Sequence, residues 1–113
     1  MDVVALDDFF DPTHRIDLIK MDIQGSEGLA LAGMKRILSS TPGIMLIMEF
    51  WPKGLALAGS APTQVLADLL AMGLMLEYID EQEKKLVTIE NIESFVASLT
   101  KEQYVSIMAS AGL

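Results

Sequence analysis

The hydrophobic and polar positions of this chain predict a strand, a helix and a second strand in its first half. Ile16–Ile23 and Ile44–Phe50 are apolar runs of strand length, and an amphipathic helical period covers Glu27–Leu38 between them. Apolar side chains occupy both faces of Ile16–Ile23, which is typical of a parallel strand covered on both sides. The short links between the three elements favour a right-handed parallel crossover.

The same pattern predicts the elements on either side of this crossover. A short strand and a brief helical turn, which Asp8 could cap, come before it, and a Gly-rich loop follows it. Next come a helix that Pro62 starts and Gly73 ends, and two strands that should pair antiparallel. Two short helices, capped by Asn91 and Thr100, come last. These predicted segments are Asp2–Leu6, Asp8–Phe10, Trp51–Ser60, Pro62–Met72, Leu74–Ile79, Leu86–Ile89, Ile92–Leu99 and about Lys101–Ser110.

A polar cluster lies where the first apolar run meets the helix. Its residues are Asp22, Gln24, Gly25, Ser26 and Glu27. Open α/β sheets bind their ligands outside the carboxyl ends of the parallel strands, facing the N-terminus of the next helix. The segment is therefore predicted to form one wall of an active site. Glu49 ends the second apolar run and would lie beside it.

Several of these residues also have a structural interpretation. Asp22 could cap the turn, and Glu49 could simply be exposed to solvent. The role of Glu27 could be no more than to complement the helix dipole. Lys20 shares a strand face with Leu18, and a buried ammonium group needs a partner. We therefore expect Lys20 to be buried in an ion pair with Asp22 or Glu49 rather than to act in catalysis.

Other residues with possible chemistry have simpler interpretations. His14, the single histidine, lies in a loop beside Pro12 and is expected to be solvated rather than a catalytic base. Trp51 and Pro52 could line an acceptor pocket or belong to a surface loop. The eight methionines fall mainly on apolar faces, which favours core packing over a metal site.

Composition limits the class of protein. A chain of 113 residues, 51% of them hydrophobic, is long enough for one domain with a real core. The net charge of −8 argues against binding to nucleic acid or to an anionic membrane. The chain has no cysteine, which excludes a disulfide framework, a thiol nucleophile and a Cys-based zinc site. No signal peptide or membrane span is recognisable, and a cytoplasmic location fits these features.

Two motifs of the first half resemble the FkbM family of methyltransferases. The first is LDDFF at Leu6–Phe10, and the second is IKMDIQGSE at Ile19–Glu27. An apolar helix and a buried strand ending in Glu49 follow the second motif. The family carries an LDD segment and, after a spacer, the pattern I-K-x-D-x-E-G-x-E in the same strand, turn and helix.

The resemblance covers roughly Leu6–Phe50 and carries implications for the fold and the site. It implies a class I, Rossmann-like α/β fold that uses S-adenosylmethionine, usually for O-methylation. It also implies catalytic roles for Asp22, Glu27 and Glu49. Asp22 and Gln24 would contact the cofactor, with Asp22 at its methionine end or at the acceptor group.

The sequence departs from the family pattern in two ways. Gln24 stands where the family usually has Glu. The Gly-rich cofactor loop that follows the first strand of class I enzymes is not found before Ile16. Residues 1–113 therefore resemble one partial methyltransferase domain, the C-terminal half of a class I sheet. Parallel strands and a terminal antiparallel hairpin, Leu74–Ile89, would form it.

Two functions remain open from the sequence. The chain could be the substrate-side half of a methyltransferase acting on a small molecule or a sugar, or a non-catalytic, truncated interaction domain. A Gly-rich loop upstream of Met1 would favour the enzyme. If the neighbouring strand is absent, Ile16–Ile23 becomes an apolar edge, so the isolated chain should form a homodimer. It should also bind S-adenosylmethionine weakly or not at all.

Overall fold

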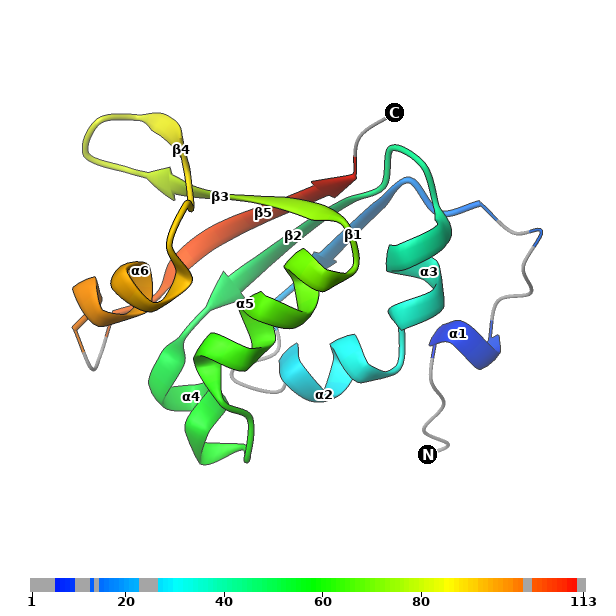
Figure 1. Cartoon of the computed structure of the whole chain (residues 1–113), viewed down its shortest axis with the longest axis horizontal. Helices are drawn as coiled ribbons and strands as arrows, with labels where there is room; N and C mark the ends of the chain where they lie inside the picture. The colour runs from blue at the N-terminus through cyan, green and yellow to red at the C-terminus, as the bar shows by residue number, and fades with distance from the viewer. Residues whose placement is uncertain (1–5, 10–12, 14, 23–26, 101–102, 112–113) are drawn as a thin grey trace.

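The structure of the chain is a computed structural model that describes residues 6–9, 13, 15–22, 27–100 and 103–111. Within these residues, five strands form one mixed sheet in the order β1-β2-β5-β3-β4 (Figure 1). The strands are β1 (Leu18–Met21), β2 (Met45–Phe50), β3 (Leu74–Asp80), β4 (Lys85–Thr88) and β5 (Val105–Ala111). The helices are α1 (Leu6–Phe9), α2 (Glu27–Ala32), α3 (Lys35–Ser40), α4 (Pro52–Leu57), α5 (Pro62–Ala71) and α6 (Ile92–Ser98).

The crossover predicted for the first half is confirmed. β1 and β2 are neighbouring parallel strands, with Met21 beside Met48. Two short helices, α2 and α3, connect them in place of one helix over Glu27–Leu38. The helix is interrupted at Gly33 and Met34, where glycine weakens a helix by about 1 kcal/mol relative to alanine. The predicted strand Asp2–Leu6 and residue Ile23 lie outside the described residues, apart from Leu6, which begins α1.

Asp7 joins the start of the chain to α3. The side chain of Met34, the N-cap residue of α3, makes no capping hydrogen bond. The Asp7 carboxylate instead accepts hydrogen bonds from the backbone N–H groups of Arg36, at 2.8 Å, and Ile37, at 3.0 Å. The Asp7 N–H in turn donates to the carbonyl of Gly33 at 2.8 Å. Asp7 therefore caps a helix about thirty residues away in sequence, while Asp8 is exposed within α1.

The hydrophobic core lies between the sheet and the helices on one of its faces. Helices α2 to α6 lie on this face (Figure 1), and their buried side chains meet those of alternate strand positions. The largest of the described side chains that are more than 98% buried are Leu38, Ile44, Leu46, Met48, Phe50, Leu55, Leu66, Leu69, Leu76 and Ile107. None of the described helices is long and apolar enough to cross a membrane.

The other face of the sheet, here called the open face, contradicts the prediction that β1 is covered on both sides. β1 is an edge strand of the described sheet, and Leu18 is 58% exposed. Buried and less buried residues alternate along β2, because Leu46, Met48 and Phe50 point to the helices and the residues between them do not. The apolar run of β1 therefore reflects a sheet face without a described helix on it, not a strand enclosed by two layers.

The predicted helix over Lys101–Ser110 is wrong, because Val105–Ala111 forms β5 in the interior of the sheet. β5 runs antiparallel to both β2 and β3. Ile107 and Ala109 alternate with more exposed neighbours, which is the period of a strand. Pairing on both sides thus outweighs the helix propensity of the Met and Ala residues.

The predicted loop Trp51–Ser60 is also wrong, because Pro52–Leu57 forms α4. Trp51 is its N-cap residue and Pro52 lies in its first turn, a position that tolerates proline because the first N–H groups have no partner within the helix. A Cβ atom added to Gly54 would overlap the ring of Trp51. The absent side chain of this glycine therefore lets the indole pack directly on the helix.

The predictions for the remaining elements are confirmed. α5 starts at Pro62, and Gly73 follows it with a φ of +88°. β3 and β4 pair antiparallel, with Tyr78 beside Val87. The Asn91 side chain caps α6 by accepting a hydrogen bond from the Ser94 N–H at 2.9 Å. The hairpin lies at the end of the sheet, but β5 follows it in the chain and pairs between β2 and β3.

Candidate functional site

One edge of the sheet gathers the ends of several strands. β1, β2 and β3 all end there, and β5 begins there because it runs antiparallel to its neighbours. The pairs Phe50–Val105 and Tyr78–Ile107 fix this alignment. Ligands of open α/β sheets bind outside the carboxyl ends of parallel strands, so this edge is where a site is expected.

Two of the predicted catalytic residues, Asp22 and Glu49, lie at this edge. Asp22 directly follows β1 and is exposed. Glu49 is the next to last residue of β2 and is partly buried. The last residue pair of β1 and β2 is Met21 and Met48, so Asp22 and Glu49 occupy the next positions on neighbouring strands. The structure thus places both carboxylates at the carboxyl ends of β1 and β2, and their catalytic roles stay predictions.

The other predicted site residues are described only in part or not at all. Gln24 lies outside the described residues, as do Gly25 and Ser26. Glu27 is the first residue of α2, and its side chain is not among those described. His14 is also outside the described residues. The predicted roles of Gln24 and Glu27 therefore stay predictions.

The prediction of a buried Lys20 is wrong. Lys20 lies in β1, but its side chain is exposed. It alternates with Ile19 and Met21, which point to the helices, so it lies on the open face. The ammonium group reaches water and needs no buried partner. Among the described residues, no group of three or more acidic or histidine side chains is placed to hold a metal ion.

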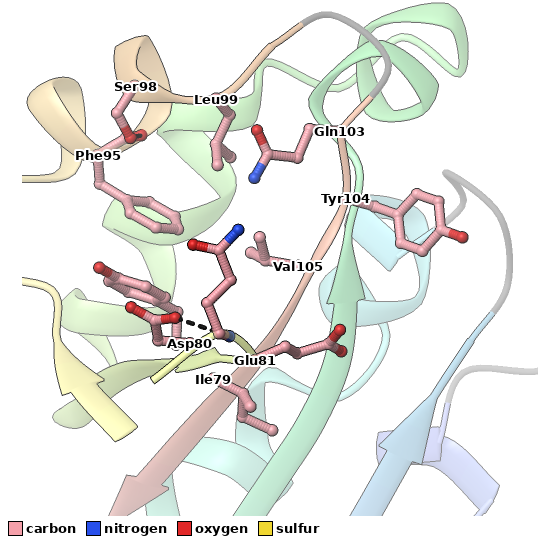
Figure 2. A pocket seen from close by; sticks show the side chains of 11 residues that line it. Ile79, Asp80, Glu81, Phe95, Ser98, Leu99, Gln103, Tyr104 and Val105 are labelled. Atoms are coloured by element: carbon pink, nitrogen blue, oxygen red, sulfur yellow. Dashed lines mark hydrogen bonds between the residues drawn. The ribbon is translucent and has the colours of Figure 1, made fainter. Parts of the chain in front are cut away.

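A cavity of about 390 Å³ lies at the same edge, beside the carboxyl end of β3 (Figure 2). It is lined by β3, the turn after it, α6 and the start of β5. Two of its aromatic residues, Tyr78 and Phe95, have ring centroids that are 4.9 Å apart. The Phe95 ring also lies 6.2 Å from the ring of Phe50 in the core. The aromatic wall is therefore anchored in the hydrophobic core.

Polar side chains complete the wall of this cavity. Figure 2 shows the Gln103 amide pointing into it, opposite Phe95, while Tyr104 points away. Asp80 is the last residue of β3, and Gln82 lies in the turn that follows it. The Asp80 carboxylate accepts hydrogen bonds from the backbone N–H groups of Gln82, at 3.1 Å, and Glu83, at 3.0 Å. Aromatic rings with amide donors and acceptors suit an uncharged ligand that has hydroxyl groups and an apolar face. The acidic residues disfavour an anion.

The sequence did not predict this cavity. Its residues come from three segments, 78–82, 95–99 and 103–105, that only the sheet order brings together. The sequence pattern predicts a helix over Lys101–Ser110, so it does not indicate that Gln103 lies near the end of β3. Trp51, which was considered as a pocket residue, instead packs on Gly54 and is not among the lining residues.

The comparisons with known proteins identify the first half of the chain. The family model of the methyltransferase FkbM domain matches residues 1–62, which is more than half of the 113 residues. The chain belongs to the FkbM methyltransferase domain family. This confirms the family that the LDD and IKMDIQGSE motifs indicate. A search of curated proteins and a search of solved structures gave no match.

The FkbM match separates the two parts of the site. Residues 1–62 include the elements from α1 to α4. Asp22 and Glu49 both lie within this matched range. The cavity is formed by β3, α6 and β5, which lie beyond the matched residues. In the sheet, β3 is two strands from β2, or roughly 10 Å at the usual strand spacing.

Proposed function

We propose that this chain forms the substrate-side half of an S-adenosylmethionine-dependent methyltransferase that methylates a hydroxyl group of a small molecule or sugar. Membership of the FkbM methyltransferase domain family supports the reaction class. The observation that carries the proposal is the cavity, which lies at the sheet edge that also holds Asp22 and Glu49. Its aromatic rings and amide groups suit a hydroxylated acceptor.

The roles of the residues follow from the chemistry of methyl transfer. S-adenosylmethionine, when bound, supplies an electrophilic methyl group on a cationic sulfur. The acceptor oxygen forms the new bond to that carbon, the carbon–sulfur bond breaks, and the hydroxyl proton must leave. The protein mainly has to align the two reactants. Asp22 or Glu49 could orient the acceptor hydroxyl or accept its proton, since Asp22 follows β1 and Glu49 is the next to last residue of β2.

The arrangement of the strands supports a partial, Rossmann-like class I sheet. β1 and β2 form a parallel crossover unit, and β1 is an edge strand of the described sheet, where a further parallel strand could pair. Asp22 is an exposed carboxylate directly after the carboxyl end of β1, and its negative charge suits the ammonium group of the methionine moiety. With Asp22 and Gln24, this half supplies only one wall of the cofactor site.

We therefore expect the chain alone to bind S-adenosylmethionine weakly or not at all. The opposite wall would have to supply most contacts to the adenosyl group, so the affinity of this half should fall in the millimolar range or weaker. Isothermal titration calorimetry with the 113-residue chain measures this. Tight, saturable binding would contradict the proposal that the chain holds only the substrate side of the site.

The cavity should bind an uncharged sugar even without the cofactor. In an NMR titration with methyl glucoside at millimolar concentrations, the shifts should be confined to residues around Phe95, Gln103 and Val105. Gln103→Ala should weaken binding by about 3- to 10-fold, because it removes hydrogen bonds worth about 1 kcal/mol. The matched control is Gln64→Ala, at an exposed position of α5 outside the cavity lining.

The outcome of this titration has a clear meaning. Glucuronic acid should bind more weakly than methyl glucoside, since Asp80 and Glu81 lie at the cavity. Shifts spread over the whole surface, or equal losses in Gln103→Ala and Gln64→Ala, would contradict an acceptor site here. The alternative function, a non-catalytic interaction domain, would then be favoured by the exposed apolar residues of the open face.

A further inference from the structure

The cavity and the predicted catalytic residue Glu49 lie on opposite sides of the sheet. Tyr78, in the aromatic wall of the cavity, pairs with Ile107, whose side chain is buried against the helices, so the cavity is on the helix side. Glu49 alternates with Met48 and Phe50, which also point to the helices, so its side chain lies on the open face. A single sugar ring held against Tyr78 therefore does not bring a hydroxyl group to Glu49.

The segment 103–105 separates these two sides at the edge of the sheet. Gln103 points into the cavity, whereas Tyr104 points away from it (Figure 2). Such alternation is typical of an extended chain. Ser106, the next residue along β5, pairs with Glu49 and therefore shares the open face with it. The segment thus presents Gln103 to the cavity and Tyr104 to the side of the sheet that carries Glu49.

Tyr104 is an exposed aromatic residue close to Glu49. It comes two residues before Ser106, the partner of Glu49, so Tyr104 and Glu49 occupy diagonal positions at the ends of neighbouring strands. Diagonal neighbours lie about 7–8 Å apart, within reach of an aromatic side chain. The Tyr104 side chain is 62% exposed, which is ordinary for a single tyrosine, but this ring lies between a cavity and a carboxylate. Its flat apolar face and polar tip suit a sugar ring.

The orientation of the Gln103 amide determines which ligand atom it can bind. Its Oε1 atom accepts a hydrogen bond from the Thr100 backbone N–H at 3.2 Å. Only the oxygen of an amide side chain can accept this bond, so the NH2 group of Gln103 is left to donate to a ligand. The oxygen that joins two sugar rings has no hydrogen to donate and can only accept. Such an oxygen therefore suits the Gln103 NH2 group, one residue away from Tyr104.

We propose that the acceptor contains at least two sugar rings, one in the cavity and one on Tyr104. The first ring packs against Tyr78 and Phe95, and the second stacks on Tyr104 and brings its hydroxyl group to Glu49. The cavity volume of about 390 Å³ is near the lower end of the usual range for ligand pockets, about 300–1,000 Å³, which fits one ring better than two. This inference rests on the proposed function, because it takes the hydroxyl group at Glu49 as the one that is methylated.

Disaccharide binding tests for the second ring. Methyl maltoside and methyl cellobioside carry an α and a β linkage, respectively, and both are compared with methyl glucoside in NMR titrations of the full chain. At least one of the two disaccharides should bind about 3- to 10-fold more tightly than methyl glucoside, because its second ring gains the contact with an aromatic face. The additional shifts should appear at the ring protons of Tyr104 and at Ser106.

Variants of Tyr104 show whether this residue provides the gain. Tyr104→Ala should remove the gain and leave the affinity for methyl glucoside nearly unchanged, because methyl glucoside occupies only the cavity. Tyr104→Phe keeps the ring and should retain the gain. Gln103→Ala should instead weaken the binding of both kinds of sugar. The matched control is Leu57→Ala, which truncates a side chain that is 75% exposed on α4, outside the cavity lining, and should change neither affinity.

The results separate the two-ring acceptor from the proposed function. If methyl glucoside binds in the cavity and neither disaccharide binds more tightly, the two-ring acceptor is wrong, while an acceptor site in the cavity stands. A gain that survives in Tyr104→Ala has the same meaning. If no sugar binds, both the two-ring acceptor and the acceptor site of the proposed function are overturned. Circular dichroism confirms that each variant folds, so that loss of binding is not mistaken for loss of structure.

Discussion

Replacing Ile107 with alanine is expected to lower the free energy of unfolding by about 2–5 kcal/mol. Ile107 has no exposed surface and lies in the interior strand β5, paired with Met48 on one side and Tyr78 on the other. Truncation removes buried methyl and methylene groups and leaves a cavity between the sheet and the helices. Since a domain of this size typically has a total stability of about 5–15 kcal/mol, the loss would be a large fraction of it.

The neighbouring residue provides the matched control. Met108 lies next to Ile107 but on the open face, where it is only partly buried. Met108→Ala should therefore cost much less, about 1 kcal/mol or below. Urea unfolding followed by Trp51 fluorescence compares the two. Equal losses would contradict the strand alternation of β5, in which one of these side chains is buried and the next is not.

The first half of the fold could be predicted because its signals are local. β1, β2 and the connection between them follow from two apolar runs and one helical period within about forty residues. The family motif falls in the same segment, so the sequence also predicts that Asp22 and Glu49 lie at the carboxyl ends of these two strands, where the structure places them. Strand ends in such a unit point to one edge of the sheet, and this rule needs no distant contact.

The second half was harder to predict because its structure depends on distant partners. The segment 103–111 contains several residues with good helix propensity, and only its pairing with β2 and β3 makes it a strand. The cavity could not be found without that strand, since Gln103 and Val105 form part of its wall. Phe95 alone, on a short helix, gives no sign of an aromatic wall.

Lys20 is exposed because the described helices cover only one face of the sheet. The two apolar faces of β1 suggested helices on both sides, and a lysine between two layers would have needed an ion pair. The described helices that pack on the sheet cover only one of its faces, so Lys20 on the other face is exposed.

Replacing Asp7 with alanine is expected to lower the free energy of unfolding by about 2 kcal/mol, the second largest effect. The substitution removes the acceptor of two backbone hydrogen bonds, from Arg36 and Ile37. Met34, the N-cap residue, has no side-chain hydrogen bond that could replace them. The hold of α1 on the rest of the fold weakens at the same time, since α1 contacts α3 through this residue.

Two further variants separate capping from charge. Asp7→Asn keeps one side-chain carbonyl oxygen that can accept a hydrogen bond, so it should lose roughly half as much stability as Asp7→Ala. Asp8→Ala, in the same helix but exposed, should change stability by less than about 0.5 kcal/mol. Urea denaturation gives all three values. If Asp7→Ala and Asp8→Ala were equivalent, the first aspartate of the LDD motif would not be the cap of α3. The expected order of the three values instead identifies Asp7 as the cap of α3, a helix about thirty residues further along the sequence. Asp7 would thereby hold the α3 end of the crossover in place.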